Sequence, residues 1–354
     1  MGNKQLKAVD FFCGGGGMSY GLQSAGIRIL AGIDYEISCK ETYEANIKDA
    51  RFIHADVFKL TESDLEESLG LQKKDDNLIL IGCSPCQYWS VIQTSKEKSE
   101  QSKNLLKEFQ RFIEHFEPGY VVVENVPGIA RRQKESGLDV FIETLESLEY
   151  IVHFGIHNTQ NYGVPQSRKR FTLIANRVTS KKLEPIELRG KILTVRDVLG
   201  ERNGFPRIPA GHQDNSGFIH SCAGLSEINM RRIKLVPKDG GNRLAFADNP
   251  ELQLQCFIGK NESFKDTFGR LWWDRPSPTI TTKFFSISNG RFVHPEEDRA
   301  LSLREGATLQ SFPKKYIFIA NGREKIARLI GNAVPPKYAK QIGEAIVNNT
   351  QHSK

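Results

Sequence analysis

The chain has 354 residues, 39% hydrophobic and 26% charged, so it is long enough for two domains and has a globular rather than a disordered composition. No apolar run reaches the roughly 18 residues of a membrane span, and the first residues lack the apolar segment of a secretory signal. Six Cys are too few for a disulfide scaffold in a chain of this length, which predicts a reducing, cytoplasmic environment.

The net charge of +7 is unevenly distributed along the chain. Residues 1–180 carry a net charge of −3, residues 181–320 carry +6 and residues 321–354 carry +4. Such an excess is expected if the C-terminal half contacts a polyanion such as nucleic acid. A basic surface that serves only solubility is the alternative, and charge alone leaves both open.

The first half alternates short apolar runs with amphipathic segments, which is typical of a parallel β-sheet with crossover helices. Strands are predicted at residues 6–12, 27–33, 51–54, 78–81, 120–123, 151–154 and 171–175. Helices are predicted near residues 18–25, 36–46, 105–116 and 141–148. From residue 178 to about 298, Gly, Pro and Asn interrupt the pattern every few residues, which predicts a smaller, irregular, β-containing lobe. Helices at 323–330 and 338–347 are expected to pack back on the first lobe.

The segment DFFCGGGG at residues 10–17 places four glycines directly after a predicted strand. Glycines between a strand and a helix let backbone N–H groups approach a ligand closely. Asp34 ends the next predicted strand and is positioned to accept from two ribose hydroxyls, while Asp56 follows the third strand and is positioned to accept from an adenine amino group. The pattern indicates a nucleoside site; a tight turn followed by two helix caps is the structural alternative.

Cys83 and Cys86 follow a buried strand in the segment GCSPCQ at residues 82–87. A thiol at a strand end suits a nucleophile, but the CxxC spacing also suits a redox dithiol, half of a zinc site or two inert thiols. The other cysteines form no second pair, so no structural metal is expected.

A carboxylate, Glu124, ends the all-valine run 121–123. Burying a carboxylate without a partner is costly, so it is expected to be solvated or functional. It would lie beside the strand that leads to Cys86, and together the two residues form a plausible nucleophile and proton donor. Further along, Arg168 and Arg170 alternate on a strand, where two guanidinium groups on one face suit a phosphate or carbonyl oxygens; an exposed strand face is the alternative.

These residues belong to a longer series of motifs, and with it the chain resembles the DNA (cytosine-5) methyltransferases from Val9 to about Tyr338. Six motifs occur in the order of that family: DFFCGGGG, the PCQ of GCSPCQ, ENV, QSRKR, REGATLQSFP (304–313) and GNAVPP (331–336). A variable basic stretch separates the fourth motif from the fifth. The resemblance implies a Rossmann-like α/β sheet that uses S-adenosylmethionine, with a smaller target-recognition lobe.

The resemblance also implies a role for each matched residue. Cys86 would attack C6 of a cytosine flipped out of the duplex, and Glu124 would hold and protonate that base at N3. Arg170 would contact the cytosine O2 and Arg168 would support the site. Thiol addition is needed because C5 of cytosine is a poor nucleophile until C6 is attacked, and flipping is needed because the base cannot be reached inside the stack.

The implied cofactor residues form a second set, contributed by the first three strand ends, the helix after the catalytic loop and the GNAVPP motif. Asp34 would bind the ribose, with Tyr35 against the adenine, and Asp56 and Val57 would read the adenine edge. The complete set is Phe12, Gly14, Gly16, Asp34, Tyr35, Asp56, Val57, Leu105 and Asn332.

The family pattern sets the expected domain limits. Residues 1–178, completed by 322–354, would bind the cofactor and perform catalysis, and residues 179–321 would recognise the target. Two departures fall in the catalytic loop: Trp89 stands where the family has Phe, and residues 100–103 replace the usual Asp-x-Arg. They place the contacts of that loop with DNA phosphates in doubt. Trp272, Trp273 and the Thr-rich segment after them suit DNA contact or, equally, core packing.

The sequence thus predicts a sequence-specific DNA methyltransferase that acts on double-stranded DNA, as a monomer without membrane contact. It would serve a restriction–modification system, with the cognate endonuclease not in a stable complex, or act as an orphan or phage modification enzyme. An RNA cytosine-5 methyltransferase and a catalytically silent DNA-binding relative are the nearest alternatives. A thiol–disulfide enzyme is the third; it requires Cys83 and Cys86 equally, whereas the methyltransferase requires only Cys86.

Overall fold

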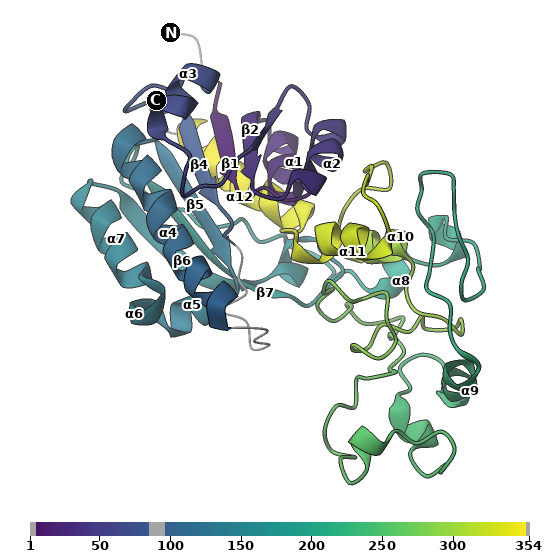
Figure 1. Cartoon of the computed structure of the whole chain (residues 1–354). Helices are drawn as coiled ribbons and strands as arrows, with labels where there is room; N and C mark the ends of the chain where they lie inside the picture. The colour runs from purple at the N-terminus through teal and green to yellow at the C-terminus, as the bar shows by residue number, and fades with distance from the viewer. Residues whose placement is uncertain (1–4, 85–95, 352–354) are drawn as a thin grey trace. The chain divides into compact units, whose positions relative to one another are not determined.

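The computed structural model describes residues 5–84 and 96–351, and the side chains of residues 5–84 and 104–350 (Figure 1). The chain divides into two compact units. The first consists of residues 1–162, 169–189 and 334–354, and the second of residues 163–168 and 190–333. The units therefore divide near Arg189 and Ala333, whereas the sequence placed the divisions after residues 178 and 321.

The first unit is built on a seven-stranded sheet in the order β3-β2-β1-β4-β5-β7-β6. All neighbouring pairs are parallel except those that involve β7, which runs antiparallel to both of its neighbours. The strands are β1 (Lys7–Phe11), β2 (Arg28–Asp34), β3 (Arg51–His54), β4 (Leu78–Gly82), β5 (Tyr120–Asn125), β6 (Ile151–Asn158) and β7 (Lys169–Asn176). All seven predicted strands are confirmed. The order reverses between β1 and β4, and ligands of such sheets bind outside the carboxyl ends of the strands at this point.

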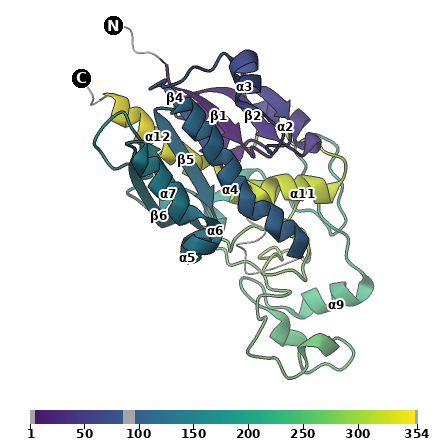
Figure 2. The same ribbon diagram turned by 60° about the vertical axis from the view of Figure 1, so that its left-hand side comes forward.

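Helices cover both faces of the sheet, as Figures 1 and 2 show. They are α1 (Gly17–Ser24), α2 (Lys40–Asn46), α3 (Glu62–Leu69), α4 (Lys96–Phe116), α5 (Gly128–Arg131), α6 (Gln133–Ser136), α7 (Leu138–Ser147) and α12 (Pro336–Gln351), with the short 3₁₀ helices η1 (Ile37–Cys39) and η2 (Thr159–Tyr162). Apolar side chains of α3, α4 and α7 share one core with alternate residues of the strands. Buried on both faces, β4 and β5 read as continuous apolar runs, which is why the sequence located them.

Helices α1 and α12 pack closely against each other in this unit. Gly21 lies so near the other helix that a Cβ atom there would be 2.4 Å from the Cβ of Ala339. Only glycine fits at such a distance. This contact confirms the expected return of the 338–347 helix to the first lobe. The same expectation is wrong for the 323–330 helix, since α11 (Arg323–Asn332) belongs to the second unit.

The second unit is far less regular. Its helices are α8 (Val195–Val198), α9 (Glu227–Leu235), α10 (Leu303–Leu309) and α11 (Arg323–Asn332), with 3₁₀ helices η3 (Glu201–Asn203), η4 (Arg243–Phe246) and η5 (Gln255–Phe257). Within residues 163–168 and 190–333, all of which are described, β structure is limited to isolated bridges: Gln166 with Ser277, Arg270 with Val293, and Val293 with Ala300.

Buried arginines take the place of a β-ladder in this unit. The Arg270 side chain is fully buried and donates to the carbonyl oxygens of Val236, Ile233, His294 and Glu297 over 2.7–3.1 Å. A guanidinium has five N–H donors, so one side chain can satisfy several loop carbonyls that have no strand partner. The buried arginines of the unit are Arg168, Arg232, Arg243, Arg270, Arg291, Arg299 and Arg304.

Among the described residues, no helix is both long enough and apolar enough to cross a membrane.

Candidate active site

The glycine-rich turn after β1 has an unusual backbone. Phe12, Gly14 and Gly16 have φ angles of 62°, 51° and 83°, in the left-handed region that favours glycine. Phe12 is not a glycine, and such conformations in other residues concentrate at functional sites. A Cβ at Gly14 would meet no atom within 4 Å, so the described residues leave the turn open at this point.

Asp34 ties the end of β2 to this turn. Its carboxylate accepts from the backbone N–H of Gly14 and of Glu36, both over 2.8 Å. Burial raises the pKa of Asp34, against these two hydrogen bonds, which lower it. Each carboxylate oxygen has a second lone pair, so the group can still accept from a ligand hydroxyl. Next to it, the Tyr35 ring is 73% exposed.

Asp56 and Val57 lie just beyond β3, at the same edge of the sheet. Asp56 accepts from the backbone N–H of Phe58 over 3.1 Å. The Val57 side chain is buried in the core, and its carbonyl oxygen accepts from Arg111 of α4 over 2.8 Å. Arg111 therefore fixes the position of this strand end. The sequence analysis had assigned it no role.

A buried polar network links β1, α1 and α2 next to the glycine-rich turn. Asp10 is fully buried on β1 and accepts from the Ser19 hydroxyl over 2.5 Å, and Ser19 in turn lies 2.9 Å from the Tyr43 hydroxyl. Burial raises the pKa of Asp10 to about 7. Since strand side chains alternate, Asp10 points away from the core that contains Val9 and Phe11 and toward α1. The sequence analysis missed Ser19 and Tyr43 because their spacing from Asp10 carries no signal.

Glu124, at the end of β5, forms an ion pair with Arg170 of β7. The Arg170 Nε atom lies 3.0 Å from the Glu124 Oε1 atom, and both side chains are about nine-tenths buried. The antiparallel pairing of β5 and β7 brings them together, because Glu124 is opposite Thr172 in the register. Beside Glu124, the Asn125 amide donates to the carbonyl oxygen of Ser84 over 3.2 Å, which ties the end of β5 to the segment after β4.

Arg168 does not share the environment of Arg170. Its guanidinium is buried in the second unit and donates to the carbonyl oxygens of Ile280, Gly331 and Ala333 over 2.9–3.3 Å. Carbonyl oxygens were one of the two partners that the sequence suggested for this arginine. The contact fixes the start of the chain segment that leads into β7.

The remaining candidates are placed as follows. Cys86, Trp89 and the side chains of residues 100–103 lie outside the described residues. Leu105 is partly buried against the core of the first unit, and Asn332 is the exposed last residue of α11 in the second unit. Burial, together with Asp10 and Glu124, raises the pKa of the Cys83 thiol, which disfavours the thiolate that a redox dithiol would require.

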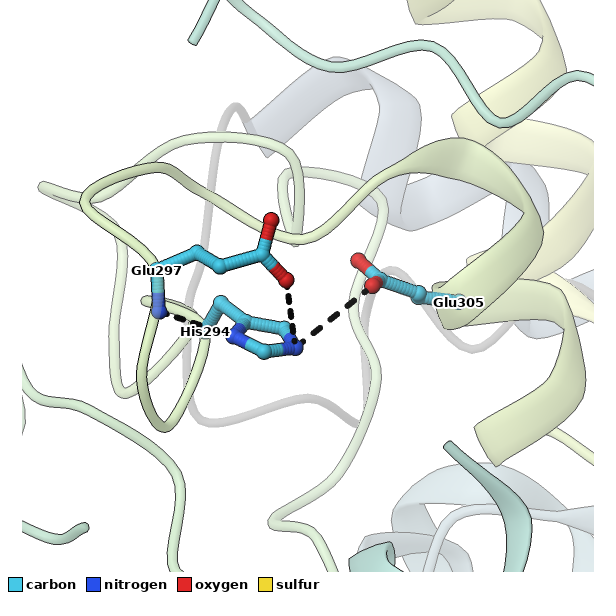
Figure 3. Close-up of side chains that lie close together, drawn as sticks. All are labelled: His294, Glu297 and Glu305. Atoms are coloured by element: carbon cyan, nitrogen blue, oxygen red, sulfur yellow. Dashed lines mark hydrogen bonds and ion pairs between the residues drawn. The ribbon is translucent and has the colours of Figure 1, made fainter. Parts of the chain in front are cut away.

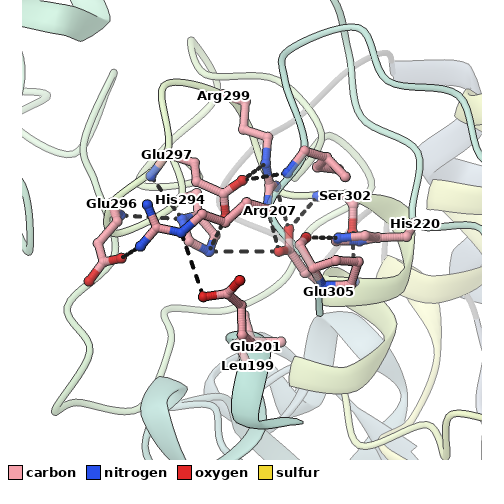
Figure 4. Close-up of polar contacts among 12 residues, drawn as sticks. Leu199, Glu201, Arg207, His220, His294, Glu296, Glu297, Arg299, Ser302 and Glu305 are labelled. Carbon is pink, nitrogen blue, oxygen red and sulfur yellow. Dashed lines mark hydrogen bonds and ion pairs between the residues drawn. The ribbon is translucent and has the colours of Figure 1, made fainter. Parts of the chain in front are cut away.

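One group of side chains in the second unit resembles a metal site. His294, Glu297 and Glu305 present ligand atoms within 4.8 Å of one another, as Figure 3 shows. However, Arg299 occupies both carboxylates: it lies 2.7 Å from Glu305 and 3.0 Å from Glu297 (Figure 4). His294 accepts two backbone N–H bonds at Nδ1, so its Nε2 carries the hydrogen and faces Glu297 over 3.3 Å. The Arg299 guanidinium therefore neutralises both carboxylates in the place where a metal ion would bind.

The electrostatics agree with this interpretation. Although burial opposes ionisation, the Arg299 guanidinium holds the pKa of Glu305 well below its usual range. Burial lowers the pKa of His294, which keeps the imidazole neutral. Ser302 extends the network to His220 over 2.8 Å. These contacts stabilise the loops of the second unit.

The comparisons with known proteins agree with this geometry. Residues 6–348 match the model of the C-5 cytosine-specific DNA methylase family. The Type II methylase M.HgiDII of Herpetosiphon aurantiacus is 39% identical over 96% of this chain and 94% of its own. The Type II methyltransferase M1.HphI of Haemophilus parahaemolyticus is 31% identical over 97% and 87%. An E. coli structure described as a prophage-encoded DNA modification methyltransferase is 20% identical, with a TM-score of 0.76 over 97% of this chain and 99% of that one, and shows the same fold.

The sheet, with a glycine turn and a buried carboxylate at its carboxyl edge, is an α/β fold shared with that methyltransferase structure. The chain belongs to the C-5 cytosine-specific DNA methylase family and is a DNA (cytosine-5) methyltransferase.

Proposed function

We propose that the chain transfers a methyl group from S-adenosylmethionine to C5 of a flipped-out cytosine in a short duplex DNA sequence, with Cys86 as the nucleophile. The ion pair between Glu124 and Arg170 carries the proposal. It brings a carboxyl group and a guanidinium together at the carboxyl edge of the sheet. Glu124 ends β5, which neighbours the strand that leads to Cys86, and Arg170 lies on β7, on the other side of β5.

The reaction needs two groups that act on opposite sides of the pyrimidine. The Cys86 sulfur would form a bond to C6 while Glu124 delivers a proton to N3. C5 would then bond to the methyl carbon as the bond between that carbon and the cofactor sulfur breaks, leaving S-adenosylhomocysteine. Loss of the C5 proton to a base then restores the C5–C6 double bond as the sulfur leaves. Adding the thiol first is what makes C5 nucleophilic enough to accept the methyl group.

Arg170 is suited to orient the base. Its Nε donor faces Glu124, and one Nη donates to the Lys169 carbonyl oxygen over 2.7 Å. Since the guanidinium carries five donors in a planar fork, it can also donate to the cytosine O2. Arg168 acts one step away: it holds the loops at Ile280 and Gly331 and so positions the strand that presents Arg170.

The residues at the first three strand ends fit S-adenosylmethionine, which supplies an electrophilic methyl group. The open backbone at Gly14 leaves space beside the turn, and the Asp34 carboxylate retains lone pairs for the ribose hydroxyls. The exposed faces of Tyr35 and Phe58 offer apolar surface to an adenine ring. In this assignment Phe12, Gly16, Asp56, Val57, Leu105 and Asn332 complete the site.

The second unit would recognise the target sequence, and the chain would act as the modification enzyme of a restriction–modification system. The Type II designation of both relatives described above supports this role. We expect a monomer that binds double-stranded DNA, with any cognate endonuclease acting separately on the same sequence.

The test is nucleoside mass spectrometry of DNA from a host free of 5-methylcytosine that expresses the chain, beside a host that expresses Cys86→Ala. We expect 5-methylcytosine only with the unaltered chain. Bisulfite sequencing of the same DNA would then identify the target.

Three other outcomes would redirect the assignment. Equal 5-methylcytosine from both chains would remove Cys86 from the mechanism. If neither sample contains it while the purified chain binds S-adenosylmethionine, RNA becomes the substrate to test. Loss of both methylation and cofactor binding would favour a silent DNA-binding relative.

A further inference from the structure

Two guanidinium groups lie over the ring of Trp272 in the second unit. The Cζ atom of Arg291 is 3.8 Å from the ring centroid and that of Arg275 is 4.7 Å from it. Both distances are within the roughly 6 Å range of a cation–π contact. The backbone approaches the indole closely as well, because a Cβ at Gly240 would lie 2.0 Å from its Nε1 atom.

The two arginines differ in what else they contact. Arg291 is buried and donates to the carbonyl oxygens of Gly240, Gly241 and Arg270, and it pairs with Asp266 over 2.8 Å. Arg275 is exposed, and within the described part of the chain its guanidinium has no ion pair and no hydrogen bond. Arg291 therefore fixes the indole of Trp272. The indole in turn holds the guanidinium of Arg275, whose donors are available to a ligand.

The segment that presents Arg275 is firmly held. Trp273 donates to Glu296 over 3.2 Å and packs edge-on against His294, a member of the buried network in Figure 4. Asp274 receives both Nε and Nη2 of Arg196, over 2.7 and 3.0 Å. The Arg275 carbonyl oxygen accepts from Val195 over 3.0 Å. An exposed arginine on such a support loses little conformational freedom when it binds a ligand.

The same segment leads directly to the motif that contains Arg168. Ser277 accepts from the N–H of Ser167 over 2.9 Å and donates to the carbonyl oxygen of Pro165 over 3.0 Å. Thr279 donates to the Ser167 carbonyl oxygen over 3.2 Å. Arg275 is thus two residues before Ser277, which forms a β-bridge with Gln166. Four residues after Gln166 comes Arg170, the residue assigned to the flipped cytosine.

We propose that Arg275, held against the ring of Trp272, is a DNA contact of the second unit that donates its guanidinium fork to acceptor oxygens or nitrogens of the target duplex. It rests on the proposed function, which places a flipped base near Arg170. Two acceptors share the required chemistry: a phosphate, and the O6 and N7 atoms of a guanine. A phosphate contact would support all sequences equally, whereas a guanine contact would determine one position of the target.

The test compares Arg275→Gln with Arg28→Gln in the full chain. Arg28 is exposed at the amino end of β2, at the sheet edge opposite the strand ends that carry the proposed site. Arg28→Gln therefore makes the same change in net charge away from that site. Plasmid DNA free of 5-methylcytosine serves as substrate, and filter binding to the same DNA without cofactor is measured over a salt series. We expect Arg275→Gln to raise the KM for DNA on the order of 10-fold and to leave the KM for S-adenosylmethionine unchanged.

The details of the result identify the acceptor. If Arg275 contacts a phosphate, the binding constant for DNA should depend less steeply on salt concentration in Arg275→Gln, with the methylated positions unchanged. If it contacts a guanine, the variant should methylate additional sequences that differ from the target at one position. Arg275→Lys should recover more of the loss in the first case than in the second, since lysine keeps the charge without the planar fork that fits both guanine acceptors. The proposal is wrong if Arg275→Gln matches Arg28→Gln in KM, in salt slope and in methylated positions. Binding that depends on Arg275 in a chain that does not methylate would instead overturn the proposed reaction.

Discussion

The two units of this protein satisfy their backbones in different ways. In the first, seven strands pair with one another, and apolar side chains of α3, α4 and α7 cover one face of the sheet. In the second, few backbone groups pair across bridges, and buried arginines such as Arg270 and Arg299 bind carbonyl oxygens and carboxylates instead. The first arrangement leaves the strand ends available for a site. The second builds a firm platform from irregular loops.

This difference changes the meaning of the positive charge. The sequence analysis assigned the basic excess after residue 180 to a polyanion or to solubility. Arg232, Arg243, Arg270, Arg291 and Arg299 are buried and engaged inside the second unit, so their charges are not displayed to a ligand. The charge available to DNA must come from exposed cations such as Arg275. Composition could not separate these groups, because buried and exposed arginines count alike.

The largest expected effect concerns the chemistry of the first unit. Glu124→Gln keeps the size of the side chain but removes the acid beside Arg170, so we expect turnover to fall by about 10²–10⁴-fold with cofactor affinity unchanged. Single-turnover methylation and equilibrium binding of S-adenosylmethionine would measure the two quantities. Near-normal turnover would exclude Glu124 as the proton donor.

The next effect concerns the second unit. Arg270→Met keeps most of the volume but removes a buried guanidinium that donates to four carbonyl oxygens and to Asp298. Of these five acceptors, the carbonyl oxygens of Val236 and His294 have no other donor among the described residues, so we expect a loss of about 3–5 kcal/mol in the free energy of unfolding. Urea denaturation would measure it. Arg231→Met is the control, because Arg231 is an exposed arginine whose pair with Glu251 should contribute less than about 1 kcal/mol. Equal effects of the two variants would contradict the structural role of the buried arginines.

A smaller effect concerns pH and the first unit. Because the folded pKa of Asp10, about 7, exceeds its ordinary value of 3.8, the folded state binds the proton more tightly, and this carboxyl should make stability fall as pH rises between those values. At about 1.4 kcal/mol per pH unit, the change from pH 5.5 to 7 is about 2 kcal/mol. Asp10→Asn should remove it, since an amide retains an acceptor for Ser19 without titrating. Parallel slopes of stability against pH in the two chains would show that another group titrates.

The fold of the first unit was accessible from sequence because most of its strands contain short apolar runs, such as the buried β4 and β5. Helix α3 was missed, since only Leu65 on it is buried and its signal is the capping box of Thr61 and Asp64. The site was accessible only as a set of motifs. Which residues meet depends on strand order, and no local pattern shows that Glu124 pairs with Arg170 or that Arg168 binds loops of the second unit.

The contact of Gly21 with Ala339 has a consequence for biosynthesis. Helix α1 emerges from the ribosome early, but the helix that covers it is made only after the whole second unit. At the usual 5–20 residues per second, the apolar surface of α1 would wait roughly 16–65 s for α12, which ends about 330 residues later. A circular permutant that begins near Gly190 would synthesise α12 and α1 almost together, and it should therefore depend less on chaperones during expression.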